Sequence, residues 1–310
     1  MKAQKPTAHV GVCIHGKFSR LELASKLKYI VESQPKSVEI DIVFSLTNTT
    51  RNTNDKSAPW KWFHNSGDEL KSEILRSGAS RVTLIREDIG KLLFRDSFVD
   101  RLDKSGSLQS RQDRHQTHLR QYWSVSKCAD QLIEWEEEGG YFYDEIVKLR
   151  DDTIVLGHIP LGQGKFQGSI YFKNCAEWEG VNEKHFIGEG RYVLGLLRRL
   201  LLDYYRYNDR YFSENSDIFG HRGGRLLNIE TFYLREPWQL RYPFKRVSPE
   251  ILPFITGRLS EHYLKSVPEC VPCQYFQNSG HPEVRWYQFD IRSRLKERKS
   301  SCNAWFQKTT

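Results

Sequence analysis

Two adjacent carboxylates, Asp151 and Asp152, directly follow a segment that the sequence predicts to be a buried strand. That segment, Tyr143–Leu149, reads YDEIVKL and is joined to the carboxylates by Arg150. In open α/β sheets, ligands bind beyond the carboxyl ends of the strands. Adjacent carboxylates there repel each other unless they share a cation, and Mg²⁺ and Mn²⁺ prefer oxygen ligands from carboxylates and substrate phosphates. The pattern therefore predicts a Mn²⁺ or Mg²⁺ site at Asp152 and Asp151, and a pair that only caps a turn is the alternative.

A second candidate for chemistry is the loop Gly16–Arg20, which follows an apolar segment of sequence HVGVCIH. Gly16 allows a close approach of the backbone to a ligand, and the side chains of Lys17 and Arg20 suit a phosphate group. The loop matches neither the Walker A pattern nor the glycine-rich dinucleotide fingerprint. An ordinary connecting loop therefore remains the alternative.

A third candidate is Glu230, which follows Asn228 and Ile229 some forty residues after the segment Asn182–Gly188. A carboxylate such as Glu230 can act as the base that deprotonates an acceptor hydroxyl. A single glutamate is more often a surface residue, so this role depends on further support.

Cys270 and Cys273 form a single CxxC pair, and His281 lies eight positions beyond. A structural zinc ion needs four ligands, and no second CxxC or HxxxH motif completes the set. We therefore expect a pair of free thiols in a loop.

These residues need a framework that brings the ends of several strands to one edge of a sheet. Apolar runs predict strands, and apolar residues at helical spacing predict helices. The expected strands are 9–15, 38–46, 81–86, 143–149 and 169–173, and the expected helices are 21–31, 109–139 and 189–207. Their alternation predicts an α/β fold with a mostly parallel central sheet flanked by helices. The polar segment 47–56 is expected to be a loop.

The composition is that of a folded protein with a sizeable core. The chain has 310 residues, of which 38% are hydrophobic, and this excludes a disordered chain. A net charge of +8 favours phosphorylated ligands, nucleic acid or an acidic membrane surface without deciding among them. No apolar run reaches the roughly 18 residues of a membrane span, and the polar N-terminus does not resemble a signal peptide. The six scattered cysteines predict reduced thiols and a cytoplasmic location.

Taken in order, the motifs of residues 9–235 resemble a glycosyltransferase-like family of plants, algae and large DNA viruses of algae. That family begins with an apolar strand and a turn that carries Gly and then Arg, as IHGKFSR does at 14–20. A helix of the form Gln-aromatic…Cys…Ile…Glu, here 121–138, leads to the motif YDEIVKLRDD of 143–152. Phe186-Ile187-Gly188 and Asn228-Ile229-Glu230 resemble its later elements.

The chain departs from the family pattern at four points. Thr231 stands where the family has an apolar residue, and Lys148 replaces the first Arg of an Arg-x-Arg-x-Asp motif. The acidic residue that precedes Phe-Ile-Gly is Glu183, and a strict Asp-x-Asp motif is absent. Metal dependence is therefore inferred from the adjacent carboxylates and from the resemblance, without a strict Asp-x-Asp motif.

The resemblance implies a GT-A-like, nucleotide-sugar-binding fold and a glycosyltransferase that moves a sugar from a nucleotide diphosphate to a glycan or glycoprotein hydroxyl. It implies a metal at Asp152 and Asp151, and Glu230 as the base of an inverting displacement. It places the nucleotide and its diphosphate against Gly16, Lys17, Arg20, Lys148 and Arg150. The viral members of the family include a xylosyltransferase that acts on a fucose-containing glycan, and this member implies UDP-xylose as the donor. A viral protein of this kind would act in the host cytoplasm.

On this reading, residues 1–235 form the catalytic domain and residues 236–310 form an extension packed on it, whose aromatic residues would shape the acceptor site. Two other classes of function stay open. A basic nucleic-acid-binding protein would use Lys, Arg and aromatic side chains for backbone contact and base stacking. A lectin-like or scaffolding relative would keep the fold without the activity.

Overall fold

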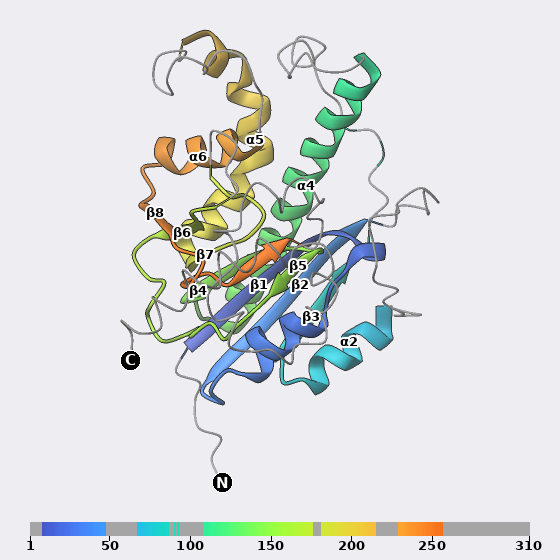
Figure 1. Cartoon of the computed structure of the whole chain (residues 1–310), viewed down its shortest axis with the longest axis vertical. Helices are drawn as coiled ribbons and strands as arrows, with labels where there is room; N and C mark the ends of the chain where they lie inside the picture. The colour runs from blue at the N-terminus through green and yellow to red at the C-terminus, as the bar shows by residue number, and fades with distance from the viewer. Residues whose placement is uncertain are drawn as a thin grey trace, which may run out of the picture.

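The computed structural model describes residues 8–47, 67–86, 90, 92, 108–175, 181–214 and 229–256. Within them the chain forms a seven-stranded sheet in the order β3-β2-β1-β4-β7-β6-β8 and a separate pair, β5 and β9 (Figure 1). The large sheet consists of β1 (Ala8–Lys17), β2 (Val38–Thr47), β3 (Arg81–Ile85), β4 (Glu145–Arg150), β6 (Ile170–Lys173), β7 (Phe186–Glu189) and β8 (Phe244–Val247). The small sheet pairs β5 (Thr153–Val155) with β9 (Phe254–Thr256) in antiparallel fashion.

The sheet has a parallel half and a mixed half. Strands β3, β2, β1 and β4 run parallel to one another. Strand β7 is antiparallel to both β4 and β6, and β8 at the edge is parallel to β6. The expectation of an α/β fold with a mostly parallel sheet is therefore confirmed. The antiparallel strand β7 was not predicted.

Helices cover both faces of the sheet. They are the short 3₁₀-helix η1 (Phe18–Arg20), α1 (Ala24–Lys26), which continues as the π-helix η2 (Leu27–Glu32), α2 (Gly67–Arg76), α4 (Leu108–Gly139), α5 (Gly190–Glu214) and α6 (Ile229–Gln239). The two long helices, α4 and α5, lie side by side and extend beyond one end of the sheet (Figure 1).

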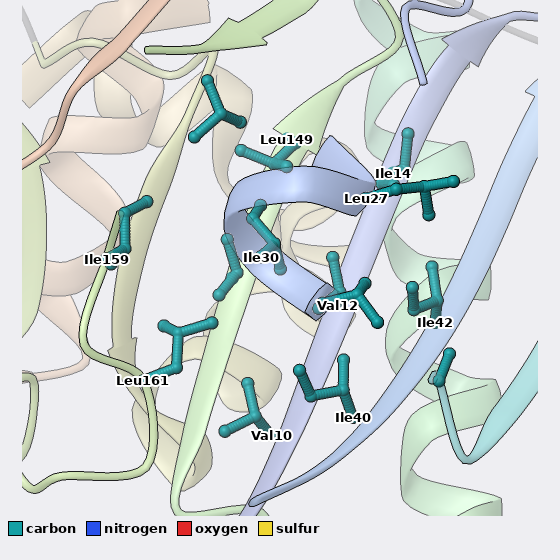
Figure 2. Packing of buried hydrophobic residues seen from close by; sticks show 14 of the residues in the cluster. Val10, Val12, Ile14, Leu27, Ile30, Ile40, Ile42, Leu149, Ile159 and Leu161 are labelled. Carbon is teal, nitrogen blue, oxygen red and sulfur yellow. The ribbon is translucent and has the colours of Figure 1, made fainter. Parts of the chain in front are cut away.

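Strand β1 is apolar on both faces because it supplies both halves of the core. Val10, Val12 and Ile14 pack with η2, β2 and the segment after β5, as Figure 2 shows. Cys13 points to the opposite face and joins a cluster formed mainly by α4, α5 and α6. Side chains alternate across a strand, so a strand buried on both faces reads as a continuous apolar run, as the sequence HVGVCIH does.

Most expected elements are present within one to three residues of their predicted ends, and one helix differs more. The helix expected at 21–31 begins at Ala24, and its second part is a π-helix. The helix expected at 189–207 continues to Glu214. The sequence did not predict α2, α6, β5, β7, β8 or β9, which are short or depend on distant partners.

The structure joins Cys13 of β1 to Cys128 of α4 in a disulfide, with the two Cα atoms 5.8 Å apart. The expectation of reduced thiols is therefore wrong for this pair. Structural disulfides are rare in the cytosol, so the cysteines no longer support a cytoplasmic location. The Cys270–Cys273 pair and His281 lie outside the described residues.

The boundary expected after Arg235 falls within α6, and β8 beyond it is the edge strand of the central sheet. The division into two domains stays a prediction, since residues 257–310 lie outside the described part of the chain. Among the described helices, none combines the length and the apolar character needed to cross a membrane.

Candidate functional site

The strand order brings the predicted residues of β1, β2 and β4 to one edge of the sheet. His15 of β1 is in register with Ser45 of β2 on one side and with Arg150 of β4 on the other. One step further along, Lys17 is in register with Thr47. All three strands are parallel, so their carboxyl ends meet here, where α/β proteins bind ligands.

Asp151 braces the loop after β1. Its side chain is fully buried, and its Oδ2 atom accepts a hydrogen bond of 2.8 Å from the backbone N–H of Lys17. The same oxygen lies 2.8 Å from a terminal nitrogen of Arg20, in an ion pair that is also buried. Burial and the neighbouring Asp152 raise the pKa of the Asp151 carboxyl, and Arg20 opposes this shift.

Gly16 is required by this brace. It has a φ angle of +139°, which disfavours residues with a side chain, and a Cβ atom there would lie 2.3 Å from Cγ of Asp151. The sequence suggested that Gly16 lets the backbone approach a ligand. The structure shows that its missing side chain makes room for Asp151.

Asp152 is also engaged by basic side chains. Its Oδ2 atom lies 3.2 Å from Arg150 and 3.6 Å from Arg20, and only 1% of the residue is exposed. Mg²⁺ and Mn²⁺ bind carboxylate oxygens directly, and here each aspartate already has a guanidinium group in contact with it. Among the described residues, no group of three or more His, Cys, Asp or Glu side chains converges on a common point. The arrangement of donors at Asp151 and Asp152 does not suit a divalent cation.

A cavity of about 140 Å³ opens at this edge of the sheet, between the ends of β1, β2 and β4 and the side of α4. It is lined by His15, Gly16, Lys17, Arg20, Thr47, Thr117, Arg120, Gln121, Ser124, Arg150 and Asp151. Four of these side chains are basic, and Asp151 in the lining and Asp152 beside it oppose two of their charges, so the cavity has a net positive charge. We call it the β1–β4 cavity.

Several polar atoms of the β1–β4 cavity have no hydrogen-bond partner within the described residues. They are both ring nitrogens of His15, the Nε and Nη1 atoms of Arg20, Nε of Arg120, Oε1 of Gln121 and Oδ1 of Asp151. A buried polar atom without a partner is costly, and His15 and Arg20 are only 1% and 6% exposed. Such a concentration of unsatisfied donors and acceptors around one cavity indicates a polar ligand.

His15 is a neutral residue in this positive environment. Burial lowers the pKa of its ring well below the usual value, and the charges of Lys148, Arg150 and Arg20 lower it further. A neutral imidazole offers one donor and one acceptor. His15 can therefore bind a ligand by hydrogen bonds without adding charge.

Lys148 does not join the other predicted phosphate-binding residues. It is fully buried beside β7, and its Nζ atom donates to the carbonyl oxygen of Glu183. The same nitrogen lies 5.4 Å from the ring centre of Phe186 and 5.2 Å from that of Tyr233. Burial lowers the pKa of Lys148 to about 7. This residue holds the segment before β7 in place and does not line the β1–β4 cavity.

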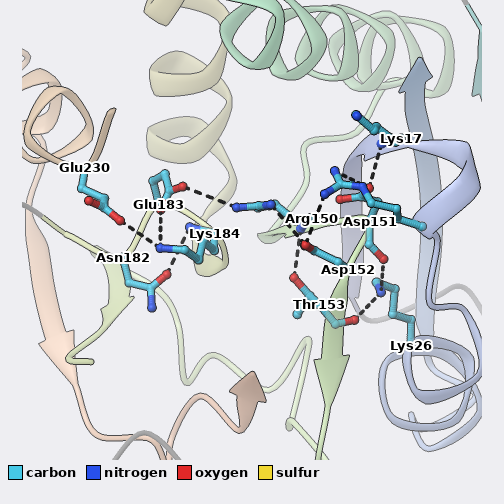
Figure 3. A network of polar contacts seen from close by, with 11 residues as sticks. Lys17, Lys26, Arg150, Asp151, Asp152, Thr153, Asn182, Glu183, Lys184 and Glu230 are labelled. Atoms are coloured by element: carbon cyan, nitrogen blue, oxygen red, sulfur yellow. Dashed lines mark hydrogen bonds and ion pairs between the residues drawn. The ribbon is translucent and has the colours of Figure 1, made fainter. Parts of the chain in front are cut away.

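Glu230 lies at the start of α6 and is connected to the cavity by a row of alternating charges (Figure 3). Lys184 lies 2.9 Å from Glu230 and 3.4 Å from Glu183. Glu183 lies 3.9 Å from Arg150, which lines the cavity. Burial disfavours the charge of Glu183, but Lys184, Lys148 and Arg150 outweigh this effect and lower its pKa.

The sequence analysis missed the contribution of α4 to the site. Thr117, Arg120, Gln121 and Ser124 line the cavity, whereas Leu119, Tyr122 and Val125 between them are fully buried in the core. Residues spaced by three or four positions share one face of a helix. This polar stripe beside the buried apolar face of the helix was the available signal.

Neither a protein-family model nor a curated protein sequence matches this chain.

Proposed function

We propose that the protein is a glycosyltransferase that binds the diphosphate of a nucleotide sugar in the β1–β4 cavity and transfers the sugar to a glycan hydroxyl. The observation that carries the proposal is the cavity itself: four basic side chains and several unsatisfied polar atoms at the carboxyl edge of a parallel sheet. Arginine and lysine side chains with this arrangement suit phosphate oxygens. The order of motifs along the chain resembles that of a glycosyltransferase-like family, and for this reason we propose a nucleotide sugar as the ligand.

The reaction needs two things from the protein. The bond between the anomeric carbon and a diphosphate oxygen breaks, so the departing nucleoside diphosphate must be stabilised as its charge develops. Arg20, Arg120 and Arg150 line the cavity, and in this proposal they stabilise that charge. The acceptor hydroxyl oxygen bonds to the anomeric carbon and loses its proton to a base.

Glu230 is the proposed base. In a direct displacement its carboxylate takes the hydroxyl proton, and the configuration at the anomeric carbon is inverted. Glu230 does not line the cavity, and its link to the lining residue Arg150 runs through Lys184 and Glu183. A GT-A-like form of the fold and UDP-xylose as the donor rest on the family resemblance and belong to the same proposal.

The test is the release of nucleoside diphosphate from a panel of UDP- and GDP-sugars, with and without simple glycan acceptors. Gln121→Glu is the informative variant, because it adds a negative charge to the cavity with almost no change of shape. Gln131→Glu is the matched control, since it lies on the same helix outside the cavity lining and its amide donates to Glu134 at the surface. We expect turnover of one donor by the wild type and the control, and a loss of about tenfold or more in Gln121→Glu. Absence of turnover with every donor contradicts the proposal.

A further inference from the structure

We infer that the β1–β4 cavity binds the diphosphate group directly through guanidinium groups, with no divalent cation between protein and ligand. This inference rests on the proposed function for the identity of the ligand. It concerns the chemistry of binding, in which Arg20, Arg120 and Arg150 take the place that a metal and its carboxylates would have.

The two candidate metal ligands, Asp151 and Asp152, are already paired with basic side chains. Asp151 is paired with Arg20 at 2.8 Å, and Asp152 lies 3.2 Å from Arg150. Both carboxylates are at most 1% exposed. A Mg²⁺ or Mn²⁺ ion needs oxygen ligands at roughly 2.1 Å, so it would have to displace guanidinium groups that hold the buried charges.

The charge of the cavity lining also disfavours a divalent cation. The lining contains Lys17, Arg20, Arg120 and Arg150, which outnumber the two carboxylates, Asp151 and Asp152, that pair with Arg20 and Arg150. An excess of basic side chains already favours an anion and opposes the entry of a further cation. The cavity therefore has the charge that a metal would otherwise provide.

Two guanidinium groups in the cavity keep N–H donors that can bind a ligand. Arg20 pairs with Asp151 through one terminal nitrogen at 2.8 Å, whereas its other terminal nitrogen lies 3.6 Å from Asp152. That second nitrogen and the Nε atom have no hydrogen-bond partner within the described residues. Arg120 is half-buried in the cavity wall and forms no ion pair in the described part of the chain, and its Nε atom is also unsatisfied. Guanidinium groups bind phosphate oxygens through planar pairs of N–H donors. Arg120 is thus the cation most available to a diphosphate.

The experiment is calorimetric titration of the full chain with inorganic pyrophosphate and with UDP, in EDTA and in excess Mg²⁺. We expect both probes to bind in EDTA, with dissociation constants that change less than about threefold when Mg²⁺ is added. Arg120→Gln should weaken binding of both probes by about tenfold or more, because one charge-assisted contact is lost. Arg76→Gln, at the exposed end of α2, is the matched control and should bind as the wild type does.

Binding that requires Mg²⁺ overturns the inference, and so does absence of binding by both probes. Arg120→Gln that binds as tightly as the wild type overturns it as well. The comparison of EDTA with Mg²⁺ uses the unaltered chain, so it does not depend on the folding of a variant. Binding of pyrophosphate in EDTA without turnover of any nucleotide sugar would leave the inference standing and remove the proposed function. Turnover of a nucleotide sugar only with added metal would support the proposed function and overturn the inference.

Discussion

A Cβ atom on Gly16 would lie 2.3 Å from Cγ of Asp151, so the loop after β1 and the carboxylate after β4 fit only because residue 16 has no side chain. Asp151 in turn accepts the N–H of Lys17 and pairs with Arg20. These contacts connect two neighbouring strands at the wall of the β1–β4 cavity. The geometry of the cavity therefore depends on a glycine and a buried aspartate that touch each other.

Gly16→Ala should lower the free energy of unfolding by about 2–4 kcal/mol, because it combines an unfavourable φ angle with a clash against Asp151. Gly140→Ala is the matched control: its φ angle is +65°, and nothing lies within 4 Å of the added carbon. The control should lose only about 1 kcal/mol. Urea denaturation of both variants measures the difference. Equal losses would show that the contact with Asp151 is not tight.

Arg20→Gln should destabilise the protein by about 3–5 kcal/mol, because it leaves the buried carboxylate of Asp151 without its cation. Asp151→Asn alone should also destabilise it, since Arg20 then loses its closest partner. The double variant should lose clearly less than the sum of the two. A double-mutant cycle from denaturation curves measures this coupling, and simple additivity would contradict the described ion pair.

The stability of the protein depends on pH through Glu236, which lies on α6, the helix that carries Glu230. Glu236 is 1% exposed, and burial, together with Asp203 of α5, raises its pKa to about 8. Its folded pKa lies above its unfolded value, so its contribution to stability is complete below about pH 4.5 and is lost as the pH rises to about 8.

Glu236→Gln should flatten this part of the stability profile and should be more stable than the wild type above about pH 8 by ~2 kcal/mol. Denaturation at about pH 5 and about pH 9 measures the change. Glu138→Gln, whose carboxylate is at the surface of α4, is the control and should keep the slope of the wild type. A wild-type slope in Glu236→Gln would mean that another group causes the pH dependence.

Much of the parallel half of the fold follows from local sequence. Strands β1, β2 and β4 are apolar runs, and Asp151 and Asp152 sit at the end of β4 because they follow that run directly. The placement of Lys148 was not predictable in this way. Lys148 is in register with Phe186 of β7, and it is this distant strand, together with Tyr233 of α6, that covers its side chain.

The contribution of α4 was missed for a similar reason. The polar stripe of Thr117, Arg120, Gln121 and Ser124 is visible in the sequence, but its meaning depends on where the helix crosses the sheet. That position is set by packing against β1 and β2, as the Cys13–Cys128 disulfide illustrates. Pairing between segments more than a hundred residues apart has no local signal.

Glu230→Gln should reduce the rate of sugar transfer by about 10²–10⁴-fold and leave donor affinity nearly unchanged, because the amide keeps the shape and loses the base. Steady-state rates with donor and acceptor, beside calorimetric donor binding, separate the two effects. Glu134→Gln on the surface of α4 serves as the control. An unchanged rate would exclude Glu230 as the base, and products with retained configuration would do the same.

The most direct test of the central claim is calorimetric titration of the full chain with nucleotide sugars, beside Gln121→Glu. We predict that at least one nucleotide sugar binds with a stoichiometry of one, and that the added carboxylate in the β1–β4 cavity weakens this binding by about tenfold or more. The contrary result is that no nucleotide sugar binds, or that one binds equally well to Gln121→Glu. Tight, salt-sensitive binding of nucleic acid in its place would show that the basic side chains serve a different ligand.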